Sequence, residues 1–366
     1  MSYLLKKLGK VKKSPIQVLL KKPQGLNKKP KPDPIGADFI KWEKKEYKLL
    51  KPRLRKLDIK LDETLNKGSN VDVHHSPKLE KIYGRKNLFL KVFRNSKSIW
   101  GFSGAGASSS IFESTVAQNL LAMKGFCPRV YDLVEVEGKT AQVVDFITGF
   151  EKPEPVRDPR FQYWMSAWEN KINHVGGKMI DFQGTKLKDH NKYKKYLLAE
   201  TARRNLANGH CSGMYQSVGN NPGIRNSKAR LETYKFKDFE GKNVLDIGCS
   251  NGMLMRGAYD LGAKRVSGID YPNMAEMAQE LAIMDGYFNL DFFGGNLKKM
   301  SGKQMQKLTG IKRFDIHLFF AMENHVGLHP WMKNCDTMYW ESHGQPRQWE
   351  VRDIKQKVIR KGTYND

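Results

Sequence analysis

Short apolar runs alternate with stretches of helical periodicity over the last third of the chain. Runs typical of buried strands lie at Val244–Ile247, Val266–Ile269, Leu290–Phe293, Phe314–Ala321 and Thr337–Trp340. Two stretches between them, Asn251–Leu261 and Ala275–Met284, carry apolar residues at helical spacing. This alternation is typical of βαβ units, in which helical crossovers join parallel strands. The pattern predicts an α/β domain with a parallel sheet over residues 236–366.

A less regular pattern precedes this domain. Predicted strands lie at Asn87–Phe93, Arg129–Val136, Thr140–Ile147 and Lys178–Phe182, and predicted helices at Ile111–Lys124, Phe161–Ile172 and Asn191–Asn208. Glu137-Gly138-Lys139 separates two of these strands and predicts a hairpin turn. We expect a small α+β module over residues 71–200. A linker is expected over residues 201–235, where Gly and Asn residues gather.

The first 70 residues are rich in Lys and Pro, and they carry much of the chain's charge. They hold 20 of the 64 Lys and Arg residues but 7 of the 38 Asp and Glu residues. Their share is therefore about half of the net charge of +26. We expect a basic, largely extended arm, with one short amphipathic helix at Asp38–Leu50. Such a charge favours contact with a polyanion, most simply RNA.

Composition excludes several classes of protein. The chain has no glycine repeat, no apolar run of about 18 residues, and 4 cysteines in 366 residues, so collagen, membrane-spanning and disulfide-scaffold classes are excluded. The cysteines form no CxxC pair, and no metal site is predicted. The basic N-terminus lacks the long apolar segment of a secretory signal, so a cytoplasmic location is expected. The oligomeric state stays open.

The sequence Val-Leu-Asp-Ile-Gly-Cys-Ser-Asn-Gly, from Val244 to Gly252, carries the clearest chemistry. It takes a strand through a glycine-containing turn into a helix, so the backbone can approach a ligand near a helix N-terminus. Asp270 ends the next strand, where an acid can accept hydrogen bonds from ribose hydroxyls. Asp246 would repel a pyrophosphate but suits a cationic amino-acid group. The unit is therefore expected to bind a nucleoside; another nucleotide-binding α/β domain is the alternative.

This region, over about residues 236–345, resembles class I S-adenosylmethionine-dependent methyltransferases, which implies S-adenosylmethionine as cofactor. The resemblance places the methionine and ribose part of the cofactor on the first motif, the ribose on the next acid, the adenine after the third strand, and the methyl group at the end of the fourth. The residues that take these roles are Asp246, Gly248, Cys249, Ser250, Gly252, Asp270, Asn296, Leu297, Phe320, Ala321 and Met322. Ser250 stands where the family usually has glycine.

The end of the chain departs from this resemblance. The 24 residues after Ser342 are expected to form one helix, Trp349–Lys361, and little else. The last two antiparallel strands of the family are therefore expected to be absent.

Polar residues follow the fourth and fifth predicted strands. Glu323 and His325 come after the fourth, and Glu341 and His343 end the fifth. Open α/β sheets bind ligands at the carboxyl ends of their strands, so these four side chains are the catalytic candidates. A histidine there could take a proton from the acceptor, although methyl transfer from a sulfonium often needs only alignment.

Residues 77–148 resemble the small lobe of a protein-kinase-like fold. The resemblance makes Lys91 the lysine that holds nucleotide phosphates, Glu113 its ion-pair partner, and Asp181 a metal ligand. No His-x-Asp with a following Asn lies between Ile147 and Asp181, so the catalytic base is missing. A degenerate kinase-like module that docks a substrate or partner is expected here.

The fold class expected overall is α/β: a Rossmann-like methyltransferase domain preceded by a small α+β module and a basic arm. The function expected is methyl transfer from S-adenosylmethionine to an unidentified acceptor, for which the charge of the chain favours RNA. One alternative is a non-catalytic protein that binds a nucleoside or RNA on the same fold. A second alternative is a kinase-like phosphotransferase.

Overall fold

The computed structural model describes residues 54–61, 64–67, 70–96, 99, 109–147, 160–162, 174–175, 178–179, 182, 185–207, 215–216, 225, 227, 230, 239–344 and 346–364. The basic arm up to residue 53, with its predicted helix Asp38–Leu50, lies outside this part. Within it, none of the helices is both long enough and apolar enough to cross a membrane.

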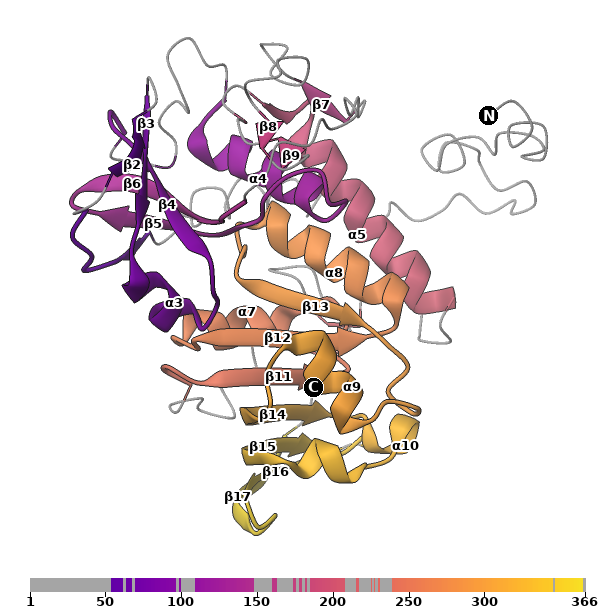
Figure 1. Cartoon of the computed structure of the whole chain (residues 1–366). Helices are drawn as coiled ribbons and strands as arrows, with labels where there is room; N and C mark the ends of the chain where they lie inside the picture. Colours follow the sequence, from indigo (N-terminus) through magenta and orange to yellow (C-terminus); the bar gives the residue numbers. More distant parts are fainter. Residues whose placement is uncertain are drawn as a thin grey trace, which may run out of the picture. The chain divides into compact units, whose positions relative to one another are not determined.

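A seven-stranded sheet forms the C-terminal domain (Figure 1). Its strands in spatial order are β13 (Leu290–Gly294), β12 (Arg265–Asp270), β11 (Asn243–Ile247), β14 (Phe314–Phe320), β15 (Cys335–Glu341), β16 (Arg347–Asp353) and β17 (Val358–Tyr364). The first five are parallel and confirm the predicted α/β sheet. Its helices are α7 (Met253–Asp260), α8 (Pro272–Met284), α9 (Gly302–Thr309), α10 (Glu323–Val326) and the 3₁₀ helix η2 (Pro330–Lys333).

Both faces of this sheet are buried. Val244 and Val266 share one core cluster with Leu254 of α7. Leu245 lies in a second cluster with Met305 of α9. Strands that are buried on both faces need continuous apolar runs, which explains why the sequence pattern located them within two residues at each end.

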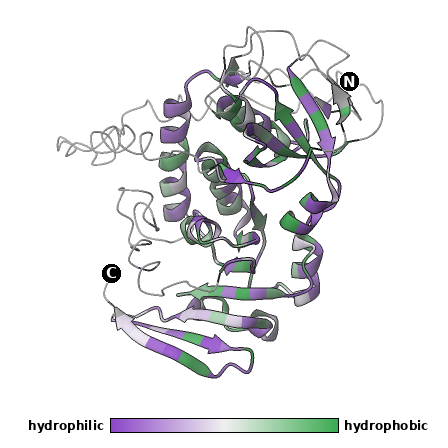
Figure 2. Cartoon of the chain, turned by 90° about the vertical axis from the view of Figure 1, so that its left-hand side faces the viewer, coloured by the Kyte–Doolittle hydropathy of each residue, from purple (hydrophilic) through white to green (hydrophobic). Residues whose placement is uncertain are grey.

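The end of the chain corrects the sequence prediction. The predicted helix Trp349–Lys361 is wrong, because β16 and β17 form an antiparallel hairpin that continues the sheet beyond β15. Val351 is fully buried, and a Cβ on Gly362 would lie 2.8 Å from the ring of Trp349. These cross-strand contacts explain the sheet structure, and Figure 2 shows hydrophilic and hydrophobic residues mixed along these strands. The two final strands are therefore present.

The upstream module is built on a six-stranded sheet. In spatial order its strands are β1 (Arg55–Lys56), β5 (Val130–Val136), β6 (Lys139–Asp145), β4 (Leu88–Phe93), β3 (Val71–His75) and β2 (Thr64–Lys67), and its helices are α3 (Pro77–Tyr83) and α4 (Ile111–Ala122). The predicted hairpin is confirmed: Glu137 and Gly138 both have positive φ angles, as a tight hairpin turn requires.

The boundary of the basic arm at residue 70 is corrected by this sheet. Strand β1 pairs with β5, and the amide of Leu57 donates to the carbonyl of Glu135. Leu57 and Ile59 are buried in the core of the module. Residues from Arg55 onward therefore belong to the module and not to the arm. The sequence did not reveal this, because the alternation of apolar and charged residues here is too short to stand out from the arm.

The segment between module and C-terminal domain contains a long helix. Strand β7 (Phe161–Gln162) pairs with β10 (Lys186–Leu187), and β8 (His174–Val175) with β9 (Lys178–Met179), before α5 (His190–Ala207). The helix predicted to begin at Phe161 is wrong at its start, and most of its length lies outside the described residues. The helix predicted at Asn191–Asn208 is confirmed, so the expected linker begins inside α5.

Helix α5 packs along α8 and ties the module to the C-terminal domain. Buried Asp285 forms ion pairs with Lys194 of α5 and with Arg256 of α7. At a second junction, Asp132 of β5 accepts hydrogen bonds from Tyr83 and from Tyr259 of α7. Burial raises the pKa of Asp132 to about 6, although these hydrogen bonds lower it. The two parts therefore meet through specific polar contacts.

Candidate functional site

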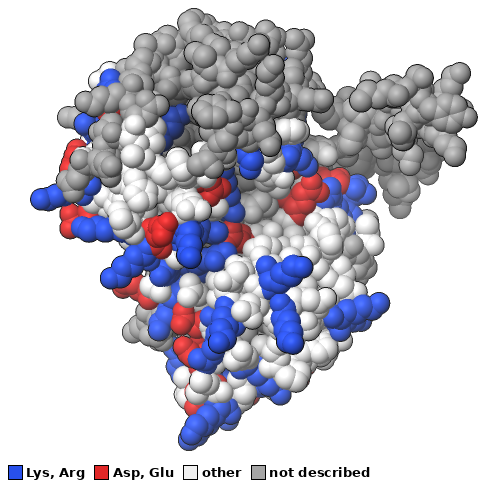
Figure 3. All heavy atoms as spheres, in the orientation of Figure 1, with Lys and Arg blue, Asp and Glu red and all other residues white. Residues whose placement is uncertain are grey.

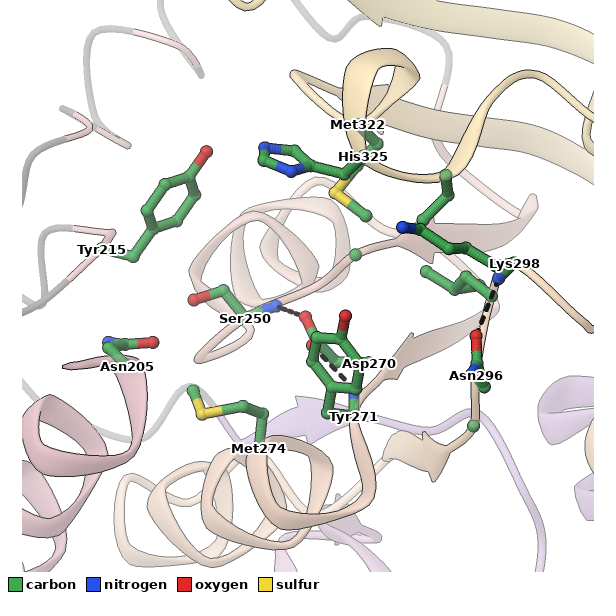
Figure 4. Close-up of a pocket in the computed structure, with 14 residues that line it drawn as sticks. Asn205, Tyr215, Ser250, Asp270, Tyr271, Met274, Asn296, Lys298, Met322 and His325 are labelled. Atoms are coloured by element: carbon green, nitrogen blue, oxygen red, sulfur yellow. Dashed lines mark hydrogen bonds between the residues drawn. The ribbon is translucent and has the colours of Figure 1, made fainter. Parts of the chain in front are cut away.

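A pocket opens at the carboxyl ends of the central parallel strands (Figure 4). Strand β11 lies between β12 and β14, so the connections leave it in opposite directions, and ligands bind at such a point in open α/β sheets. The residues that line the pocket are Asn205, Tyr215, Gly248, Ser250, Asp270, Tyr271, Met274, Gly295, Asn296, Leu297, Lys298, Met322, His325 and Val326.

The glycine turn between β11 and α7 forms one wall. Gly248 has a φ of 82°, and a Cβ there would lie 2.4 Å from the sulfur of Met322. Gly252 has a φ of 76°, and a Cβ there would lie 2.5 Å from the ring of Phe292. The amides of Gly248 and Cys249 donate to the carbonyl of Ile269, which fixes the turn against β12. Both glycines are therefore required by the backbone and by close neighbours.

We expect Gly252→Ala to destabilise the chain by about 1–3 kcal/mol, because the new methyl group meets a ring in a left-handed backbone conformation. Thermal and denaturant unfolding measure the loss. Gly344→Ala is the control, since a Cβ there would meet open space. Equal stability of the two variants would contradict the close packing at Gly252.

Asp270 is held in place by the backbone around it. Its Oδ2 accepts from the amide of Ser250 at 2.7 Å, and its Oδ1 accepts from the amide of Tyr271 at 2.7 Å. Ser250 reaches this geometry with a positive φ of 50°, so serine is accommodated where the related family usually has glycine. The carboxylate lines the pocket with an orientation fixed by two hydrogen bonds, as a ribose-binding acid requires.

Asp246 is a buried carboxylate that lacks a complete set of partners. Its side chain is 2% exposed, and Oδ2 has no hydrogen-bond partner within the described residues. Burial, followed by the charge of Asp270, raises the pKa of Asp246 to about 7, while Arg230 acts in the opposite direction. A buried acid without a partner is costly unless a ligand completes it. Asp246 is not among the residues that line the pocket, but it stands two positions before Gly248, which does line it.

The other residues predicted to hold the cofactor divide into two groups. Asn296, Leu297 and Met322 line the pocket as expected. The carbonyl of the Asn296 side chain already accepts from the amide of Lys298 at 3.1 Å. A second group lies behind the pocket wall and packs in the core instead: Cys249, Phe320 and Ala321.

Two of the pocket residues that were not predicted lie far upstream in the sequence. Asn205 comes from α5, and Tyr215 from the segment expected to be a linker. Next to it, the side-chain oxygen of Gln216 accepts from the backbone amide of Met253, and the backbone carbonyl of Gln216 accepts from the side-chain amide of Asn251. Gln216 therefore caps the start of α7. The available signal in the sequence was an aromatic residue within the Gly- and Asn-rich stretch that precedes β11.

The four catalytic candidates do not share one environment. His325 and His343 are exposed, and their ring centroids lie 5.1 Å apart at the pocket mouth. Glu323 accepts from the indole nitrogen of Trp340 at 2.9 Å. The expected position of Glu341 at the pocket is corrected, because its side chain is fully buried. One of its oxygens accepts from Nε of Arg230 at 3.0 Å, and the other accepts from Nη2 of the same guanidinium. Its carboxylate therefore faces Arg230 in the interior and not the pocket mouth, where the sequence pattern had placed it.

The kinase-like site is not confirmed. Lys91 lies on β4 as expected, but Glu113 completes a capping box at the start of α4, where its carboxylate accepts from the amide and hydroxyl of Ser110. Helix capping accounts for this acid without a nucleotide. Asp181 lies outside the described residues. Nor do three or more potential ligands gather as a metal site anywhere in the described part.

Comparisons with known proteins support the methyltransferase fold. No family model matches the chain. It is 45% identical over 65 residues to protein arginine N-methyltransferase 1 of Saccharomyces cerevisiae, which is 18% of this chain and 19% of the relative. It is 34% identical over 80 residues to the protein of the same name from Dictyostelium discoideum, which is 22% of each. The chain thus spans about a fifth of the length of these relatives.

Solved structures overlap only in part. One is the PRMT1 enzyme-prozyme complex of Trypanosoma brucei with AdoHcy, at 25% identity and a TM-score of 0.22, covering 25% of this chain and 27% of that one. Another is the bifunctional kinase-methyltransferase WbdD, at 18% identity and a TM-score of 0.29, covering 37% and 34%. The strand order, the glycine turn and the two sequence relatives carry the conclusion that the C-terminal domain has a class I S-adenosylmethionine-dependent methyltransferase fold.

Proposed function

We propose that the C-terminal domain binds S-adenosylmethionine and transfers its methyl group to an acceptor. The observation that carries this proposal is the buried carboxylate of Asp246, whose Oδ2 has no hydrogen-bond partner among the described residues and which stands beside a glycine turn. The two sequence relatives are named as methyltransferases, which supports an enzyme of this type.

Two carboxylates and two apolar residues at and behind the pocket wall have distinct roles in this proposal. Asp246 pairs with the ammonium group of the cofactor, and Asp270 accepts hydrogen bonds from the ribose hydroxyls. Leu297 and Met322 line the pocket and would supply apolar contacts to the adenosine and sulfonium part. When bound, the cofactor supplies a methyl group on a positively charged sulfur. The chain's own task is to align the acceptor and exclude water.

The acceptor enters at the mouth, where His325 and His343 lie. His325 lines the pocket and is positioned to take a proton from an acceptor nitrogen or oxygen. A guanidinium acceptor is best held by a pair of carboxylates, but Glu341 is already paired with Arg230, which leaves Glu323, with one hydrogen bond from Trp340, as the acid described at this mouth. We therefore propose RNA, rather than an arginine-rich protein, as the acceptor.

Two measurements test this function on the full chain. Calorimetry is expected to show one binding site for S-adenosylmethionine and for its demethylated product. Incubation with labelled cofactor and a cell extract is expected to place label in material that ribonuclease removes. Label in protein would contradict RNA as acceptor, and binding without any transfer would identify a nucleoside-binding protein on this fold. Absence of binding would overturn the proposal.

A further inference from the structure

A row of lysines runs from the pocket along one side of the C-terminal domain. We call it the α9 strip; it consists of Lys298, Lys299, Lys303, Lys307 and Lys312, all exposed. Residues 296–314 contain these five lysines and Arg313, but no Asp or Glu. In the area of α9, Figure 3 shows Lys and Arg side chains standing among uncharged ones.

The charges of the α9 strip are not compensated within the described residues. None of its five lysines forms an ion pair there, whereas nearby Arg313 pairs with Asp336 at 2.6 Å. Elsewhere on the surface, lysines do meet acids, as Lys124 meets Glu276 at 3.1 Å. A solvated helix face usually mixes both signs. A block of one sign favours a partner that carries the opposite charge.

The helix presents this charge on a rigid support. Met305 and Thr309 are buried under α9, and a capping box between Ser301 and Gln304 fixes its start. Lys303 and Lys307 are four residues apart and so share one face, with their Cα atoms about 6 Å apart along the axis. Regularly spaced cations on a fixed helix match a chain of regularly spaced phosphates.

The α9 strip is continuous with the pocket. Lys298 lines the pocket, and its amide is bonded to the side chain of Asn296. From there the strip follows the loop into α9, which lies beside the carboxyl end of β13 (Figure 1). A strand bound along the strip would therefore reach the pocket mouth without leaving the surface.

We propose that the α9 strip binds the phosphate backbone of a nucleic acid and leads the strand to the pocket. That this strand is the methyl acceptor rests on the function proposed above; binding itself does not. The strip exposes one large apolar residue, Leu308, and so lacks the apolar face that a membrane surface requires. Polar Gln304 and Gln306 between the lysines suit contacts with sugar and phosphate.

Charge reversal of three lysines tests the proposal on the full chain. The strip variant is K303E/K307E/K312E, which spares Lys298 in the pocket. The matched control is K78E/K81E/K86E, since these lysines are also exposed but lie in and beside α3 of the upstream module. Both variants change the net charge equally. Binding of a fluorescent 20-nucleotide RNA is followed by anisotropy over a range of salt concentrations, with calorimetry of S-adenosylmethionine alongside.

We expect the strip variant to bind the RNA at least about tenfold more weakly than the control and to lose about 2 from the slope of log K against log salt, because three phosphate contacts are removed. Cofactor binding should be unchanged in both variants. Equal RNA affinity and slope in the two variants would overturn the proposal. So would tight binding of polyglutamate, but not RNA, to the strip.

These outcomes separate the two proposals. A strip effect on RNA in a chain that binds no cofactor would leave the nucleic-acid surface standing and overturn the methyl transfer. Normal cofactor binding together with equal RNA binding by the strip and control variants would leave the cofactor site standing and overturn the nucleic-acid surface. Protection of Lys303 and Lys307 from reductive methylation by bound RNA is the expected direct sign of contact.

Discussion

Asp246→Asn is expected to abolish binding of S-adenosylmethionine and, at the same time, to stabilise the chain without ligand. The wild-type carboxylate is buried, its Oδ2 has no hydrogen-bond partner among the described residues, and Asp270 is a repelling neighbour. Asparagine keeps the shape but removes the charge, so the unfavourable burial of a carboxylate disappears. The gain is on the order of a few kcal/mol in unfolding free energy near pH 8. Asp246 would thus lower stability in exchange for binding.

The pH dependence follows from the raised pKa. Folding raises the pKa of Asp246 from 3.8 to about 7, so between these values the folded state holds a proton that the unfolded state has lost. The contribution of this group to stability is fully present below about pH 4 and is lost as the pH rises through 7. Cofactor affinity changes in the other direction, because only the ionised acid pairs with an ammonium group. It should rise through pH 7.

Thermal unfolding at pH 5 and pH 8, with and without cofactor, measures both effects. Asp58→Asn is the control, since it removes one negative charge at an exposed position of the upstream module. The Asp58 variant should bind cofactor as the wild type does and should keep its pH dependence. If the Asp246 variant binds cofactor with unchanged affinity, the assigned role of this carboxylate is wrong.

The parts of the fold that the sequence predicted are those with a local cause. The strands from Val244 to Trp340 are continuous apolar runs, and Asp270 follows the glycine turn at a short fixed spacing. The last two strands have no such run. Val351 and Trp349 contact residues across the sheet, and that pairing becomes visible only once β15 and Gly362 are in place.

The site was predictable only where its residues are close in sequence. The glycine turn and the acid after β12 were found, but Tyr215 reaches the pocket from a segment without periodicity. The buried pairing of Glu341 was not predicted, because its partner, Arg230, is 111 positions away. At a strand end, an acid that binds substrate and one that closes a buried ion pair look the same in sequence.

Asp291→Ala is expected to destabilise the chain by about 3–5 kcal/mol. Its buried carboxylate on β13 meets Arg85 at 2.5 Å, Arg129 at 2.7 Å and Arg265 at 3.2 Å. Two of these arginines come from the upstream module, and both lie over the ring of Tyr131. Without the acid, three guanidinium groups would crowd a buried site without their counter-ion.

The dependence of the unfolding free energy on pH in the acidic range gives a second measurement. Burial raises the pKa of Asp291, but Arg129, Arg85 and Arg265 lower it more, so the net pKa lies below its ordinary value. The stabilisation is therefore present above about pH 4 and is lost as the pH falls through the lowered pKa. Asp291→Asn should remove this part of the pH dependence while it keeps the side-chain volume.

Denaturant unfolding of the full chain measures the loss, with Asp336→Ala as control. Asp336 pairs with Arg313 on the surface, where both side chains are well exposed, so its removal should cost less than about 1 kcal/mol. Because Asp291 joins the upstream module to the methyltransferase sheet, its loss should also separate one unfolding transition into two. A single transition at unchanged denaturant concentration would show that the other contacts, such as those of α5 with α8, suffice to hold the two parts together.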